Sequence, residues 1–173
     1  MDERAGRVDV RTEHSGRNDH VSVDYTLTVP TAAAIEIHSI SGTLKVTNVQ
    51  GPVRAETISG DVTTSGSPHV EVAKSVSGNV EYSAPLARGG SYNLNSHSGT
   101  IRVILVGDTG FELNADTFSG SIHSDIPLTL GASARDDRRR FGPGRRTRAT
   151  FGDGSAALTV RTFSGDINIS KRQ

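Results

Sequence analysis

Apolar and polar residues alternate along short stretches of this chain, and the stretches recur at fixed distances from a glycine. The positions seven and five residues before this glycine, and two and four residues after it, are mostly aliphatic, while the residues between them are mostly charged or polar. Period-two alternation of this kind predicts a half-buried β-strand on each side of the glycine. The alternation breaks two residues before the glycine, so we expect the chain to turn there. No stretch has helical periodicity over three turns.

The glycine stands in a six-residue phrase, [ST]-x-S-G-x-[ILV], that occurs six times. The six glycines are 18, 18, 21, 21 and 45 residues apart and are Gly42, Gly60, Gly78, Gly99, Gly120 and Gly165. A period near 20 residues predicts stacked repeat units. We therefore predict an all-β, single-domain β-solenoid, a parallel β-helix-like stack of about seven rungs. In the third unit Val70 and Val72 lie one place out of phase, which a one-residue bulge would explain.

These glycines are predicted structural corners, because a tight turn often needs a positive φ, which glycine adopts without steric cost. The neighbouring Ser and Thr hydroxyls can satisfy the backbone groups that a corner frees. The core is expected to consist of small aliphatic side chains in ladders, closed by Phe118 and Phe163 near the corners.

The chain divides into an end segment and a stack. Residues 8–11 alternate, and residues 21–29 alternate strongly up to Pro30, so residues 1–30 are predicted to be N-terminal strands that cap one end of the stack. Residues 31–173 would form the solenoid repeats, with an Arg-rich loop inserted at 131–151. Gly, Pro and like charges predict that this loop is mobile.

Composition excludes several classes of function. The 173 residues carry 19 basic and 19 acidic side chains, so net charge gives no reason to expect a nucleic-acid partner. The chain has no Cys, which excludes disulfides and thiolate metal sites. No apolar run approaches the roughly 18 residues of a membrane span, and the first residues have no signal-peptide pattern.

The inserted segment is the one strongly charged part of the chain. Residues 135–148 contain seven Arg against two Asp. Because guanidinium groups match phosphate and similar oxygens, the candidate polyanion-binding residues are Arg138, Arg139, Arg140, Arg145, Arg146 and Arg148.

The sequence contains only weak signals for catalytic residues. Asp61 and Asp166 both follow a repeat glycine, and β-helix polysaccharide lyases and hydrolases use Asp clusters for metal binding or acid–base work. Other units have Thr, Asn or Ser at that position, so a corner role suffices for both. The six His lack metal-ligand spacing, and no nucleotide, nucleophile-elbow or calcium motif is present. We predict no catalytic residue, no metal site and no cofactor.

The chain resembles the bacterial putative-adhesin family of β-strand-repeat proteins, a domain of largely unknown function. The resemblance is carried by the corners at 59–62 and 164–167 with their four relatives, by the entry segment 27–30 and by the closing segment 158–162, and it covers roughly residues 20–170. It implies a right-handed β-solenoid-like stack, often exported or tethered at the cell envelope, with no established catalytic motif. The Arg-rich insertion departs from this pattern.

These observations predict a non-enzymatic, adhesin-like interaction or scaffold domain of the bacterial cell envelope, which displays side chains in rows on a rigid solenoid. Any signal or anchor would lie outside this sequence. The expected partner is a protein or glycan at the cell surface, with self-association through the end rungs as a further expectation. The alternative is a carbohydrate-binding or carbohydrate-active β-helix protein, which as an enzyme would need convergent carboxylates in a cleft.

Overall fold

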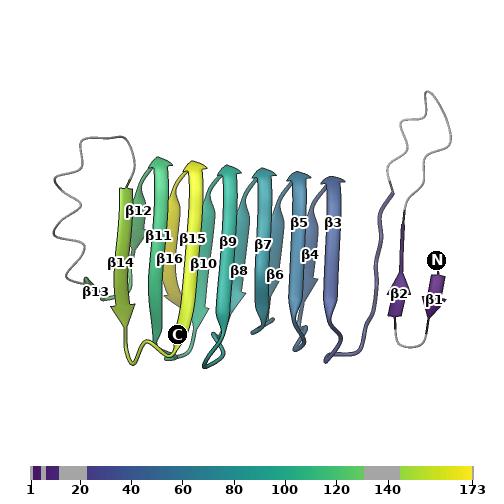
Figure 1. Ribbon diagram of the computed structural model, residues 1–173, viewed down its shortest axis with the longest axis horizontal. Helices are drawn as coiled ribbons and strands as arrows, with labels where there is room; N and C mark the ends of the chain where they lie inside the picture. Colours follow the sequence, from purple (N-terminus) through teal and green to yellow (C-terminus); the bar gives the residue numbers. More distant parts are fainter. Residues whose placement is uncertain (1, 5–6, 12–22, 131–144, 173) are drawn as a thin grey trace.

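The computed structural model of the chain describes residues 2–4, 7–11, 23–130 and 145–172. All regular structure in these ranges is β. Two facing sheets form the stack, and a separate two-stranded sheet lies in the N-terminal part (Figure 1). The larger sheet contains β3 (Ile35–Ser41), β5 (Val53–Ser59), β7 (Val70–Ser77), β9 (Ser91–Ser98), β11 (Phe111–Ser119), β13 (Thr129–Leu130), β14 (Arg145–Phe151) and β15 (Ala156–Ser164). The smaller sheet contains β4 (Leu44–Thr47), β6 (Val62–Ser65), β8 (Val80–Ala84), β10 (Ile101–Val106), β12 (Ile122–Ser124) and β16 (Ile167–Arg172).

Each repeat unit gives one strand to each sheet, and a Ser-Gly corner joins the two strands. Equivalent strands of neighbouring units pair in parallel and in register, as in Leu44↔Val62 and Ile101↔Ile167. The predicted β-solenoid is therefore confirmed. The described residues form six complete rungs, where about seven were expected. At the β11 end of the stack, the larger sheet continues with β14, which is antiparallel to β11, and then with β13, which is antiparallel to β14.

The core lies between the sheets and follows from the alternation in the sequence. The inward residues are mainly Val, Leu, Ile and Ala, with Tyr82, Tyr92 and Phe111 as the largest buried side chains. The third unit has the expected bulge: Val53 pairs with Val70, but Arg54 pairs with Val72, which places Glu71 outside the register. Both Val70 and Ala73 are thereby buried.

Phe118 and Phe163 do not close the core. They are 45% and 48% exposed, because both precede the glycine by two residues and the chain turns their side chains outward there. The expectation that they seal the interior is wrong.

The units do not stack in the order of the sequence. The strand order of the larger sheet places β15 between β9 and β11, and that of the smaller sheet places β16 between β10 and β12. The sixth unit therefore lies between the fourth and the fifth, as the yellow strand among green ones shows in Figure 1. The long link makes this order possible: β14 runs antiparallel along the outside of β11, and a turn then returns the chain on the inner side of β11.

The N-terminal part differs from the expected strands. β1 (Asp2–Arg4) and β2 (Arg7–Asp9) pair only with each other, and residues 23–30 have no strand assignment. Val23, Tyr25, Leu27 and Val29 are 38–57% exposed although their alternation favoured a half-buried strand. The segment runs beside the β3 end of the stack (Figure 1) without joining the sheet. A capping role for residues 1–30 stays a prediction.

The position of the sixth unit predicts the effect of a C-terminal truncation. A chain that ends at Ser155 loses an internal rung, and with it the pairing of β15 to both β9 and β11. Because rungs are stabilised by their neighbours, we expect loss of the cooperative urea transition followed by circular dichroism. A chain ending at Lys171, which removes only exposed or undescribed residues, should unfold like the full chain. Equal urea midpoints for the two truncated chains would contradict the internal position of the sixth unit.

Candidate functional site: the corner row and the outer face beside it

At the corners, the backbones of neighbouring units lie too close together for a side chain. A Cβ on Gly99 would lie 2.2 Å from the carbonyl oxygen of Gly78, and a Cβ on Gly120 would lie 2.0 Å from that of Gly165. Gly60, Gly78 and Gly165 make the same approach to the preceding corner in the stack. Gly42 is in the end rung, and a Cβ there would meet nothing within 4 Å. The repeated glycine therefore has a steric cause that lies in the neighbouring unit.

A Ser or Thr hydroxyl three residues before the glycine stabilises this close packing of neighbouring corners. It points inward and donates a hydrogen bond to the glycine carbonyl of the preceding rung: Ser75 to Gly60 at 2.8 Å, Ser96 to Gly78 at 2.9 Å, Thr162 to Gly99 at 3.3 Å and Thr117 to Gly165 at 3.1 Å. Two units lack this bond. The Ser39 hydroxyl of the end rung donates instead to the carbonyl of Ser41 at 2.9 Å, and the buried Oγ1 of Thr57 has no partner among the described residues. This ladder explains the first Ser or Thr of the repeated phrase.

Asp61 and Asp166 belong to a second ladder. Oδ1 of Asp61 accepts a hydrogen bond from the backbone N–H of Asn79 at 2.7 Å, and Oδ1 of Asp166 accepts one from Ser121 N–H at 2.8 Å. The two carboxylates are three rungs apart in the stack, which is about 14 Å at a strand spacing of about 4.8 Å. Paired carboxylates of glycosidases lie within about 9.5 Å, so these two do not form such a pair.

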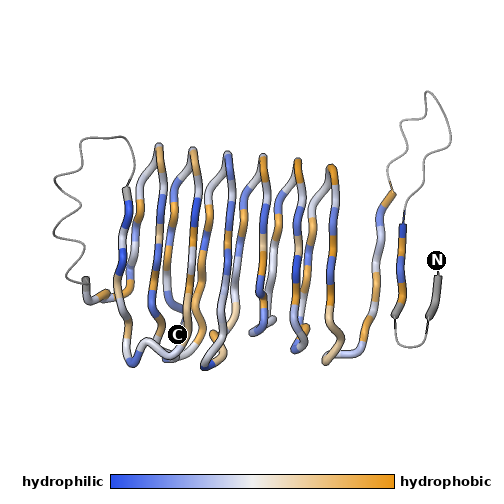
Figure 2. Tube along the Cα trace, in the orientation of Figure 1, coloured by the Kyte–Doolittle hydropathy of each residue, from blue (hydrophilic) through white to orange (hydrophobic). Residues whose placement is uncertain are grey.

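The residues two before each glycine form an exposed row along the corner. We call these side chains the corner row; in stack order they are Ile40, Ile58, Val76, His97, Phe163 and Phe118. The five apolar members are 39–77% exposed. In Figure 2 the tips of the corners have a hydrophobic colour, except for the tip at the end of β9. Contiguous exposed apolar residues of this kind are typical of interaction sites.

Three rings at one end of the corner row stack on one another. Phe118 and Phe163 have ring centroids 4.7 Å apart and nearly parallel planes, and His97 stacks on the other face of Phe163 at 5.0 Å. Such contacts contribute about 0.5–1.5 kcal/mol each. They fix the orientation of the rings, so this end of the row is preorganised.

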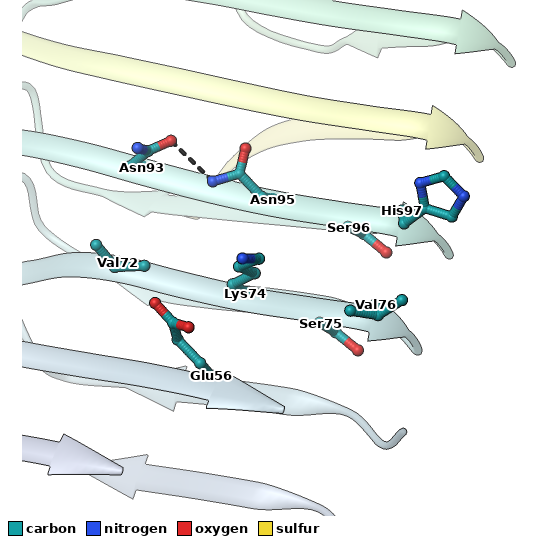
Figure 3. Close-up of a pocket in the computed structure, with 9 residues that line it drawn as sticks. All are labelled: Glu56, Val72, Lys74, Ser75, Val76, Asn93, Asn95, Ser96 and His97. Carbon is teal, nitrogen blue, oxygen red and sulfur yellow. Dashed lines mark hydrogen bonds between the residues drawn. The ribbon is translucent and has the colours of Figure 1, made fainter. Parts of the chain in front are cut away.

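A shallow depression lies on the outer face of the larger sheet beside the corner row. It has a volume of about 480 Å³ and spans β5, β7 and β9 (Figure 3). Its polar lining includes Glu56, Lys74, Asn93 and Asn95, and Asn95 Nδ2 donates a hydrogen bond to Asn93 Oδ1 at 2.9 Å. A second depression of about 340 Å³ adjoins it toward β3.

The outer face also carries a row of charges parallel to the corner row, four residues before each glycine. We call it the charged row; in stack order its members are His38, Glu56, Lys74, Asn95, Arg161 and Asp116. It continues onto Arg146 of β14, whose guanidinium forms an ion pair with Asp116 at 2.8 Å. The row has mixed sign and is no basic patch.

The candidate polyanion-binding residues fall into two groups, one outside the described residues and one in β14. Arg138, Arg139 and Arg140 lie outside the described residues. Arg145, Arg146 and Arg148 belong to the strand β14, so the expected loop at 131–151 is wrong for residues 145–151, which continue the larger sheet. Polyanion binding by these arginines stays a prediction.

Sequence reasoning did not select the corner row as a site, although its signal was present. The alternation breaks at this position, yet five of its six residues are apolar. An apolar residue at a turn, repeated in phase, indicates an exposed apolar row. Among the described residues no group of three His, Asp or Glu could hold a metal ion, and no helix is long and apolar enough to cross a membrane.

Comparison with known families assigns the chain. The model of the family Toastrack DUF4097, a domain of unknown function, matches residues 17–170. The chain belongs to the Toastrack family. The resemblance drawn from the six corners is thereby confirmed. No curated protein matches this Toastrack chain.

A solved structure is similar to part of the chain. The crystal structure of a putative cell adhesion protein from Clostridium sporogenes ATCC 15579 superposes with a TM-score of 0.48 at 11% sequence identity. The alignment covers 72% of the Toastrack chain and 57% of the other protein, so the Toastrack chain spans just over half of that protein's length.

The close approach at the corners predicts that Gly→Ala destabilises the domain by different amounts at different corners. Gly99→Ala should force two rungs apart and destabilise the domain by about 3 kcal/mol or more. Gly42→Ala meets no neighbouring atom and strains only a φ of 117°, which should cost about 1–2 kcal/mol. Urea denaturation of the two variants measures the difference, and equal losses would contradict the steric explanation.

Polyanion binding can be tested without disturbing β14. We expect heparin affinity to fall linearly with the logarithm of salt concentration, and the Arg138→Ser, Arg139→Ser, Arg140→Ser triple variant to bind at least about tenfold more weakly at 50 mM salt. Deleting 135–148 would remove part of β14, so substitution is the cleaner change. Lys45→Ser, on the exposed side of β4, is the control, and equal affinity of the triple variant and the control would refute the prediction.

Proposed function

We propose that this chain is a non-enzymatic interaction domain of the bacterial cell envelope, which presents rows of side chains on a rigid solenoid to a partner at the surface. The observation that carries the proposal is the corner row. Five exposed apolar side chains and one imidazole lie in line along six rungs.

Rigidity makes this row suitable for binding. The backbone under it is held by the hydroxyl ladder and by the close stacking of the glycines, and three of its rings are stacked. A preorganised surface loses little conformational entropy when a partner binds. The exposed apolar strip supplies the hydrophobic contribution, and the polar depression beside it supplies hydrogen-bonding groups.

The outer face also favours a second candidate function, carbohydrate binding. The amides of Asn93 and Asn95 and the charges of Glu56 and Lys74 surround the depression beside the His97 ring. Such groups can hydrogen-bond sugar hydroxyls. Glu56 is the one carboxylate in the lining, whereas glycoside hydrolysis uses a pair, so this geometry supports binding over hydrolysis.

A matched pair of substitutions tests the main proposal. Val76 in the corner row is 39% exposed, and Val106 on the smaller sheet is 37% exposed. We expect the fluorescently labelled domain to bind saturably to intact cells of the bacterium that encodes it. Val76→Lys should weaken this binding at least about tenfold, because a charge in an apolar contact must be desolvated. Val106→Lys should bind as the unaltered domain does.

Absence of saturable binding, or equal loss in the two variants, would refute the role of the corner row. A glycan array distinguishes the second candidate. Binding there that is abolished by Asn95→Ala, and is insensitive to Val76→Lys, would favour the carbohydrate function.

A further inference from the structure

The corner row has two chemically different halves. Its first three members are the aliphatic side chains of Ile40, Ile58 and Val76, and its last three are rings. We propose that two copies of this chain associate through their corner rows, with the two stacks antiparallel about a two-fold axis. This inference rests on the proposed interaction role and names the partner as a second copy.

The regular spacing of the row favours a second copy as partner. Its side chains repeat at the strand spacing of about 4.8 Å. A surface that is to contact every member must have the same repeat, and a second copy has it by construction. Two identical surfaces that contact each other form an isologous, closed pair.

Two arrangements with two-fold symmetry are geometrically available, and the shapes of the side chains favour one. An axis along the stack places like rungs opposite each other, so ring meets ring and aliphatic meets aliphatic. An axis across the stack reverses one copy, so each ring meets an aliphatic side chain. Ile40 then faces Phe118 of the second copy, Ile58 faces its Phe163, and Val76 faces its His97. Pairs of large and small side chains fill an apolar contact evenly.

The charged row favours the same arrangement. With the axis across the stack, the charged rows of both copies lie on the same side of the contact, in reversed order. Glu56 then faces Arg161 of the second copy, and His38 faces its Asp116. By symmetry each of these pairs occurs twice. Neither Glu56 nor Arg161 takes part in the ion pairs of the described residues.

The size of the contact sets its strength. Six rungs span about 24 Å, and a strip one side chain wide with its flanking rows is smaller than the roughly 1,200–2,000 Å² of stable interfaces. The dimer is therefore weak and concentration-dependent in solution. Copies held close together on one surface would associate far more readily, because tethering raises the effective concentration.

Sedimentation equilibrium of the whole chain from about 10 μM to 1 mM tests this directly. We expect dimerisation that rises with concentration at pH 7.5. Glu56→Arg and Arg161→Glu should each raise the dissociation constant by about tenfold or more, and the double variant should restore it to within about threefold. Lys45→Glu, an exposed charge reversal on the smaller sheet, should leave it unchanged. Val76→Lys should be monomeric, with an unaltered circular dichroism spectrum.

A monomer at all concentrations overturns the proposal, and so does a dimer that Val76→Lys leaves intact. A dimer weakened by both single reversals but not restored by the double variant overturns the antiparallel arrangement. These failures can be distinguished from failure of the proposed function. If the chain stays monomeric but Val76→Lys still loses cell binding, the corner row has a different partner and the interaction role stands.

Discussion

The structure depends on one steric constraint, the contact between the corner glycine of one unit and the glycine carbonyl of the unit before it. The space between them excludes a methyl group. Two parallel chains can turn together at this separation only if the unit that approaches the carbonyl carries no side chain at that point. The corner therefore fixes the vertical alignment of every unit, and the in-register pairing of both sheets follows from it.

Alignment at the corner has consequences on both sides of the backbone. On the inside, the Ser or Thr hydroxyl donates to the carbonyl that the turn leaves without a strand partner. On the outside, residues that precede the glycine by two are brought into one line, and residues that precede it by four into another. A surface with chemically distinct rows is thus produced by repetition of a local turn.

Much of this architecture could be predicted from the sequence, because its causes are local and periodic. The alternation around each glycine predicted both strands of every unit, and the misplaced Val70 and Val72 predicted the bulge. The outward position of Phe118 and Phe163 was not predicted, since hydrophobicity alone does not tell which side of a turn a residue occupies. The strand β14 was obscured by its arginines. Arg146 and Arg148 alternate with Thr147 and the buried Ala149 on a strand that pairs with β11 and β13.

The order of stacking could not be derived from a repeat at all. Each unit carries the same pairing surfaces, so the sequence of the sixth fits beside the fourth as well as beside the fifth. The 45-residue spacing before the last glycine indicated an insertion, but not that the chain returns inside the fifth unit. Similarly, the alternation at 23–29 does not reveal whether an edge will accept the segment as a strand.

The interior position of the last unit also limits how such a domain can evolve in length. In a simple solenoid, duplication of a terminal repeat adds one turn at either end. Here the end of the stack on the C-terminal side is built from β11, β12 and the β14 strand, all earlier in the chain than the terminal repeat. A duplicated final repeat would have to open an already closed core between existing rungs. Gain or loss of repeats is therefore easiest among the units nearest the N-terminus, where sequence order and spatial order agree.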